Sequence, residues 1–144
     1  MTAAVFIDTN ILLYSIDEDP AAEQKRRRAQ QILLSEAWGW SVQVAAEFYV
    51  NATSIKRPFR LSPADAVQLI ERWLAFPILD LTPTLFRAAI GMQQHFQLSY
   101  WDAAILGAAK QMGCNTVFSE DLNAGQIYDG ITVVNPFADL SQLK

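Results

Sequence analysis

The sequence predicts an α/β fold in which helices flank a short central parallel sheet. Short apolar runs alternate with longer segments that carry apolar residues at helical spacing, and this alternation is typical of βα units. The first apolar run, residues 3–7, shows no polar alternation and ends at a carboxylate, Asp8. Such a run is typical of a strand buried on both faces of a parallel sheet. Together these observations predict a sandwich with helices around the sheet.

Helix start signals define the elements of the first half of the chain. Residues 11–14 continue the first apolar run as a short helix. Asp19 precedes a proline, which is the pattern of an N-cap and a first helical turn, and it is predicted to open the next helix. Residues 38–41 are predicted to form a turn and a very short strand, after which Ser41 can cap a helix over residues 42–54.

The second half of the chain alternates helix and strand in the same way. Ser62 and Thr82 each precede a proline, so each is predicted to cap a helix. The helix after Ser62 carries an apolar stripe that includes Trp73, which we assign to the core rather than to base stacking. A further helix begins after Ser99 and stops at Gly113. The remaining predicted strands are residues 77–81, 114–119 and 131–134.

Composition limits the class of protein and the kind of site. A length of 144 residues predicts a single domain, residues 1–144, and 51% hydrophobic with 18% charged residues is typical of a globular protein. No apolar run approaches the roughly 20 residues that span a bilayer, and no signal peptide is recognisable, so we expect no membrane association. The single Cys114 favours a reducing cytoplasm.

The same counts restrict the metal and the partner. One histidine and one cysteine exclude a zinc site of the Cys/His kind, which leaves oxygen ligands and therefore Mg²⁺ or Mn²⁺. The net charge of −4 argues against broad electrostatic attraction to nucleic acid.

Four acidic residues lie where a βα fold would bring them to one edge of the sheet. Asp8 and Asp121 each follow a predicted strand, Asp102 lies on the apolar face of the helix after Ser99, and Glu47 borders the apolar stripe of its helix. Each also has a structural interpretation. The strand-end aspartates could be caps or turn residues, Asp102 could form a capping box with Ser99, and Glu47 could be a surface glutamate. Anions gathered at one edge repel one another, and a divalent cation would remove that repulsion.

Four stretches of the sequence carry a resemblance to a known family. They are residues 6–10 (FIDTN), 43–48 (QVAAEF), 100–105 (YWDAAI) and 119–122 (SEDL). In order and approximate spacing they resemble the motifs of PIN-domain proteins, and the whole chain is similar to VapC-type toxins of toxin–antitoxin modules. The resemblance implies a PIN-like three-layer sandwich. It also implies a metal-dependent endoribonuclease, commonly a homodimer, that a cognate antitoxin inhibits.

The resemblance assigns roles by position. The acids that match the family's site are Asp8, Glu47, Asp102 and Asp121. Of these, the three aspartates are the expected metal ligands. Asn10 and Ser119 match polar positions that support the site. Many members carry another acid two residues after the one matching Asp121, and here that position is Asn123, which weakens the case for a second metal.

We therefore expect a Mg²⁺- or Mn²⁺-dependent endoribonuclease that cleaves RNA with a metal-activated water. A phosphatase using Asp8 as nucleophile is one alternative, although phosphatases of the haloacid-dehalogenase type have a second aspartate where Asn10 stands. A catalytically silent PIN-like module that binds RNA or protein is another, and it would be expected to lack one of the acids.

The surroundings of the site lead to three further expectations. The basic runs at residues 25–28 and 56–60 are either solvated surface or the source of a few phosphate contacts. An acidic groove rimmed by Tyr14, Trp38 and Trp101 could accept an inhibitor peptide whose Arg or Lys enters the carboxylates. Because adjacent residues of an extended segment point to opposite sides, Glu120 is expected to face away from the site as a solvated or capping residue.

Overall fold

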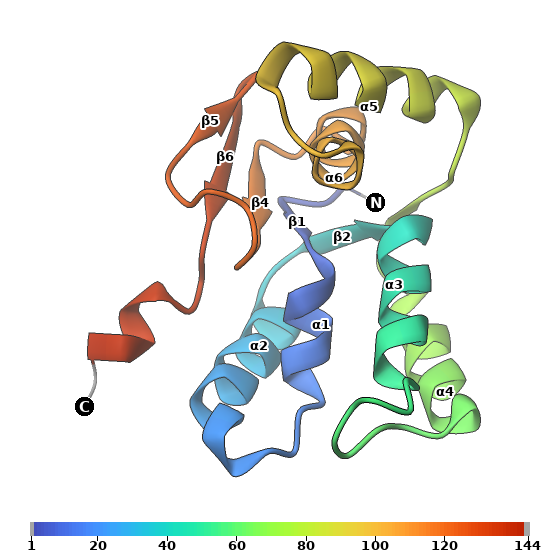
Figure 1. Cartoon of the computed structure of the whole chain (residues 1–144), viewed down its shortest axis with the longest axis vertical. Coiled ribbons are helices and arrows are strands. Elements are labelled where there is room, and N and C mark those ends of the chain that lie inside the picture. The colour runs from blue at the N-terminus through green and yellow to red at the C-terminus, as the bar shows by residue number, and fades with distance from the viewer. Residues whose placement is uncertain (1, 143–144) are drawn as a thin grey trace.

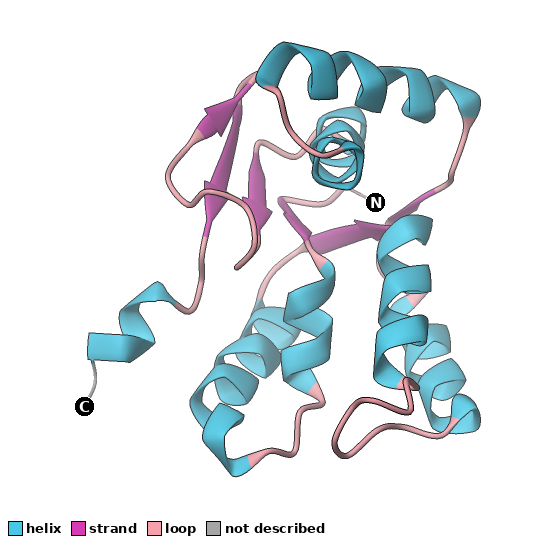
Figure 2. Cartoon of the chain, viewed as in Figure 1, coloured by secondary structure: helices cyan, strands magenta, loops and turns pink. Residues whose placement is uncertain are grey.

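The computed structural model describes residues 2–142 and contains, within that range, a six-stranded sheet flanked by six α-helices (Figure 1). The strands are β1 (Val5–Ile7), β2 (Trp38–Ser41), β3 (Ile78–Leu79), β4 (Thr116–Phe118), β5 (Ile127–Tyr128) and β6 (Ile131–Val134). The helices are α1 (Thr9–Ser15), α2 (Glu23–Ser35), α3 (Val42–Ala52), α4 (Pro63–Trp73), α5 (Pro83–Phe96) and α6 (Tyr100–Met112), with 3-10 turns η1 (Pro20–Ala22) and η2 (Ala138–Gln142). Helices α5 and α6 lie on one side of the sheet and α1 to α4 on the other (Figure 2). The predicted three-layer α/β sandwich is confirmed.

Strand β1 lies at the point where the chain changes direction across the sheet. The strand order is β3-β2-β1-β4-β6-β5, so the chain first builds the sheet on one side of β1 and then crosses to the other. Phe6 of β1 is in parallel register with Gly39 of β2 and with Val117 of β4. In open sheets of this kind, ligands bind at the carboxyl ends of the strands beside such a switch point. Asp8 and Asp121 follow the two strands that flank it.

One strand of the described sheet was not predicted from the sequence. Strand β5 pairs antiparallel with β6, and a tight turn at Asp129 and Gly130 joins them. Both turn residues have positive φ angles, 52° and 83°, as a two-residue hairpin turn of the Asp-Gly type requires. The Asp-Gly pair was the available sequence signal. A strand of two residues after a polar segment shows too little alternation to be recognised.

The predicted caps at Ser41, Ser62, Thr82 and Ser99 are formed, whereas Asp19 caps the 3-10 turn η1 and not α2, which has no side-chain cap. The capping side chains that accept a backbone N–H are those of Asp19, Ser41, Ser62, Thr82 and Ser99. Gly113 ends α6 with a left-handed φ of 85°. Several predicted boundaries are wrong by a few residues. The first helix is longer, α3 ends two residues earlier, and residues 38–41 are all strand with no turn. The strands predicted over residues 77–81 and 114–119 are shorter, Ile78–Leu79 and Thr116–Phe118.

Aromatic residues fill the core around β2. Trp38 and Trp40 are fully buried and meet edge to face with ring centroids 5.8 Å apart, and Trp73 packs against Trp40 at 6.1 Å. The assignment of Trp73 to the core is therefore confirmed, whereas Trp38 cannot rim a groove. Between the two tryptophans, a Cβ at Gly39 would lie 2.3 Å from the Sδ of Met112 and 2.8 Å from the Cβ of Ala3, so any larger residue there would force both neighbours to shift.

No helix among residues 2–142 is both long and apolar enough to cross a bilayer.

Candidate active site

Asp8 ends β1 and at the same time caps α1. Its Oδ1 accepts the backbone N–H of Thr9 at 2.7 Å, and its Oδ2 accepts the hydroxyl of Ser119 at 2.8 Å. Only 6% of the residue is exposed. Burial is the main reason why the pKa of Asp8 rises from 3.8 to about 6; the charges of Asp121 and Glu47 add to the rise, and the two hydrogen bonds oppose it. The capping interpretation of Asp8 is confirmed, and one carboxylate oxygen is held by the cap while the other binds Ser119.

Glu47 reaches the same region from α3. Its Oε2 accepts the hydroxyl of Thr9 at 2.7 Å, and its Oε1 accepts the side-chain amide of Gln43 at 2.9 Å. Gln43 is buried and also lies 3.4 Å from the carbonyl oxygen of Trp101, so it ties Glu47 to the start of α6. Glu47 is half-buried and directed at α1, which contradicts its interpretation as a surface glutamate.

Asp121 joins the group through two polar side chains. Asn10 donates from Nδ2 to Asp121 Oδ2 at 3.1 Å. The hydroxyl oxygen of Ser119 accepts the backbone N–H of Asp121 at 3.1 Å while its own proton is donated to Asp8. Ser119 is fully buried, so this hydroxyl connects two of the acids without contact with solvent. Asn10 is thus hydrogen-bonded to Asp121, and Ser119 to both Asp8 and Asp121.

Glu120 points away from the acids, as expected, but it is neither solvated nor a cap. Its Oε1 accepts the hydroxyl of Tyr14 at 2.7 Å, and its Oε2 accepts the ammonium of Lys25 at 2.7 Å. The expectation was wrong because both partners lie on other elements, α1 and α2, whose approach to this segment depends on the tertiary fold.

The carboxylate of Asp102, within residues 2–142, does not take part in the hydrogen bonds that link the other three acids. The backbone N–H of Asp102 donates to the hydroxyl oxygen of Ser99 at 3.1 Å, which is the helix cap. Its carboxylate is half-exposed and, within residues 2–142, makes no hydrogen bond or ion pair. Its connection to the group is indirect, because Gln43 binds both Glu47 and the carbonyl of Trp101. Hydrogen bonds through Thr9, Asn10 and Ser119 therefore link Asp8, Glu47 and Asp121, and this network does not include the Asp102 carboxylate.

The donor set fits Mg²⁺ or Mn²⁺ by its chemistry. The carboxylates offer only oxygen ligands. Burial, and to a smaller extent the charges of Asp121 and Glu47, raises the pKa of Asp8, and a divalent cation would offset this cost of ionising it. The carboxylates are not preassembled around one point: in the described part of the chain, no three His, Cys, Asp or Glu side chains are arranged to hold a metal. Both oxygens of Asp8 and both of Glu47 instead accept hydrogen bonds from the protein.

Two residues of the site were missed in the sequence. Thr9 donates its hydroxyl to Glu47 and its N–H to Asp8, and Gln43 orients Glu47. Gln43 could have been found from its position four residues before Glu47 on the same helix face. The role of Thr9 depends on the approach of α3 to α1, which no local pattern records.

The basic runs are used largely within the protein. Lys25 binds Glu120, and Arg28 donates to the carbonyl of Pro136 at 3.2 Å. Arg57 donates to the carbonyl of Leu13 at 3.2 Å. Within residues 2–142, the members of the two runs whose side chains make no hydrogen bond or ion pair are Arg26, Lys56 and Arg60.

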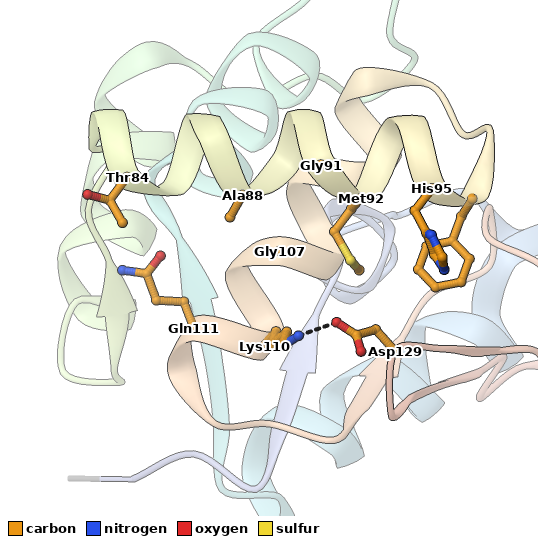
Figure 3. A pocket seen from close by; sticks show the side chains of 10 residues that line it. Thr84, Ala88, Gly91, Met92, His95, Gly107, Lys110, Gln111 and Asp129 are labelled. Carbon is orange, nitrogen blue, oxygen red and sulfur yellow. Dashed lines mark hydrogen bonds and ion pairs between the residues drawn. The ribbon is translucent and has the colours of Figure 1, made fainter.

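A cavity of about 800 Å³ lies away from the acids (Figure 3). It runs along α5 and the C-terminal half of α6, with an ion pair between Lys110 and Asp129 on its border. None of the four acids lines it. Asp129 lies in the turn before β6, at the amino end of that strand, whereas Asp8 and Asp121 follow carboxyl ends.

Comparisons with known proteins agree with the fold. The family model of the PIN domain matches residues 5–129. A toxin–antitoxin complex from Klebsiella pneumoniae is similar at 20% identity and a TM-score of 0.66, over 92% of this chain and 97% of that chain. VapC20 of Mycobacterium tuberculosis, described as a sarcin–ricin loop cleaving toxin, is similar at 18% identity and a TM-score of 0.63, over 81% and 91%. DNA-bound VapBC from Salmonella typhimurium is similar at 18% identity and 0.65, over 94% and 99%. No curated protein matches the sequence significantly.

Proposed function

This chain belongs to the PIN domain family, and on that premise we propose that it is a Mg²⁺- or Mn²⁺-dependent endoribonuclease, the toxin of a VapC-type toxin–antitoxin pair. The observation that carries the proposal is the convergence of Asp8, Glu47 and Asp121, which come from three separate elements and meet around Thr9 and Ser119. Carboxylates that burial and mutual repulsion disfavour are typical of functional sites.

Each residue has a proposed role. When bound, Mg²⁺ or Mn²⁺ supplies Lewis acidity at the scissile phosphate and activates the attacking water. Asp8 and Asp121 would hold the ion, and Asp102 would complete the ligand set from the start of α6. Glu47, oriented by Gln43, would position the attacking water. The hydrogen bonds from Thr9 and Ser119 keep the Asp8 carboxylate in one orientation.

The partners follow from the same proposal. The substrate is RNA, and two of the similar structures are named as toxin–antitoxin or VapBC assemblies, which supports a cognate antitoxin for this chain as well. We propose that an Arg or Lys of that antitoxin competes for the carboxylates. The proposed compartment is the cytoplasm, consistent with the single free Cys114.

A homodimer is the proposed assembly. A cavity of about 560 Å³ next to Glu47 is bordered by four large apolar side chains that are 53–65% exposed. These are Val50, Leu81, Phe86 and Trp101. Exposed apolar groups gathered in this way mark an interaction surface. Phe86→Asp should shift the molar mass in light scattering from dimer to monomer, and an unchanged mass would exclude this surface.

The two alternatives are less well supported. A phosphatase of the haloacid-dehalogenase type would have a second aspartate two residues after the nucleophile, and in this chain that position is Asn10. A catalytically silent module is expected to have lost an acid, and all four acids are present.

Cleavage of RNA in a metal titration tests the proposal. Asp8→Asn and Asp102→Asn should each abolish cleavage while the far-ultraviolet circular dichroism stays unchanged. Chelation should abolish it reversibly, with recovery on addition of Mg²⁺ or Mn²⁺. The matched control is Asp129→Asn, which removes a carboxylate far from the site and keeps a residue suited to the hairpin turn. Full cleavage in excess chelator would rule out the metal mechanism.

A further inference from the structure

Lys25, Tyr14 and Glu120 form a closed hydrogen-bonded network beside the candidate active site. The Tyr14 hydroxyl donates to Glu120 Oε1 at 2.7 Å. The Lys25 ammonium donates to Glu120 Oε2 at 2.7 Å and to the Tyr14 hydroxyl at 3.2 Å. Each side chain therefore contacts the other two. Because the three come from α1, α2 and the segment after β4, they tie that segment to both helices.

Aromatic packing holds the network in place. The rings of Tyr14 and Phe137 meet edge to face with centroids 5.0 Å apart, and Phe137 is buried. The Lys25 Nζ lies 4.8 Å from the centroid of the Tyr14 ring and 5.9 Å from that of Phe137. An exposed ion pair contributes little to stability, but the Lys25 and Glu120 side chains are only 38% and 26% exposed. The packing therefore limits the orientations that Glu120 can adopt.

The backbone of Glu120 connects this network to the candidate metal site. Its N–H donates to Asn10 Oδ1 at 3.3 Å, and the Nδ2 of the same asparagine donates to Asp121 Oδ2 at 3.1 Å. On the other side, Ser119 is held by Asp8. The side chains of these three consecutive residues thus bind different partners. Because the adjacent side chains of Glu120 and Asp121 point to different sides, holding the Glu120 side chain on one side directs the Asp121 side chain to the other side, toward Asn10.

We propose that Lys25 and Tyr14 are positioning residues that act through Glu120 to orient Asp121 for metal binding. The ammonium also neutralises a carboxylate that would otherwise stand next to Asp121 as a further negative charge. The inference rests on the proposed function, because it takes Asp121 as a metal ligand.

Binding of Mn²⁺ to the full chain, measured by calorimetry and by electron paramagnetic resonance, tests the proposal. Lys25→Met should weaken binding about 10-fold, the lower end of the loss usual for an outer partner of a metal ligand. Lys25→Arg should bind within about threefold of wild type, because Arg keeps the charge and the donors. The matched control is Lys110→Met, which breaks a surface ion pair with Asp129 and should leave Mn²⁺ affinity unchanged. Wild-type affinity in Lys25→Met would overturn the proposal.

A double-mutant cycle tests the route through Glu120. If Lys25 acts through Glu120, the variant that combines Lys25→Met with Glu120→Ala should bind Mn²⁺ no more weakly than the weaker single variant. Losses that multiply would show that Lys25 acts independently, and the proposal would be wrong. Tyr14→Phe removes only one hydroxyl, so it provides a second variant if Lys25→Met fails to fold, with an expected loss of about threefold.

Nuclear magnetic resonance separates failure of this inference from failure of the proposed function. In metal-free protein, Lys25→Met should shift the side-chain amide signals of Asn10, and Lys110→Met should not. If Lys25→Met shifts the Asn10 signal but the wild type neither binds Mn²⁺ nor cleaves RNA, the proposed nuclease function is refuted, whereas the positioning role of Lys25 is retained. Unchanged Asn10 signals and Mn²⁺ affinity in an active enzyme would refute the positioning alone.

Discussion

Asp8→Asn should make the metal-free protein more stable at neutral pH although it abolishes activity. Burial and neighbouring negative charge raise the pKa of Asp8 from 3.8 to about 6, which corresponds to about 3 kcal/mol of unfavourable free energy for the ionised form in the folded state. An amide is neutral and avoids this cost. It can accept only one of the two hydrogen bonds that Asp8 accepts, a loss of about 1 kcal/mol. The expected net gain is about 2 kcal/mol.

The effect should depend on pH in a defined direction. At about pH 4 and below, Asp8 of the folded protein is protonated and its contribution to stability is intact. As the pH rises from about 4 to about 6, the unfolded chain loses its proton first, so the free energy of unfolding of the wild type falls. Above about pH 6, the free energy of unfolding of the wild type has fallen by the full amount of about 3 kcal/mol. The variant lacks this titration, so the difference between the two proteins should grow from pH 4 to pH 7.

Urea unfolding of both proteins in chelator, at pH 4 and at pH 7, measures this difference directly. By thermal unfolding, the variant should melt about 4–8 °C higher at pH 7. Asp129→Asn is the control, because it removes an exposed carboxylate. Saturating Mg²⁺ should stabilise the wild type and not Asp8→Asn. An identical difference in unfolding free energy at both pH values would refute the reasoning that Asp8 is destabilised by its surroundings.

Three other predictions concern the site, the packing and the substrate. Asp121→Asn should lower the cleavage rate less than Asp8→Asn does, and high Mg²⁺ should partly restore the rate. A magnesium titration that shows no such rescue would assign Asp121 a direct, indispensable role. Gly39→Ala should destabilise the fold by about 1–3 kcal/mol, measured by urea unfolding, because the added methyl group has no space. Wild-type stability would show that α6 can shift away from β2. Replacement of the basic residues Arg26, Lys56 and Arg60 tests their contact with RNA. Each phosphate contact that is lost should reduce the slope of log RNA affinity against log salt concentration by about 0.7. An unchanged slope would show that these residues are solvated surface.

Local chemistry in the sequence determined most of the fold. Uninterrupted apolar runs identified the buried strands, and a capping side chain before a proline identified helix starts at Ser62 and Thr82. These features are readable because each depends on residues within one turn of one another. The same locality placed Asp8 and Asp121 at strand ends, from which a shared edge followed once the sheet was parallel.

Tertiary structure alone decided how the acids relate to one another. The bond between Thr9 and Glu47 joins residues 38 positions apart, and the bond between Tyr14 and Glu120 joins residues 106 positions apart. Such pairs meet only when strand order and helix packing are complete, and no periodicity in either segment records the other. For this reason the sequence identified the carboxylates but did not reveal that Thr9 binds Glu47 or that Lys25 binds Glu120.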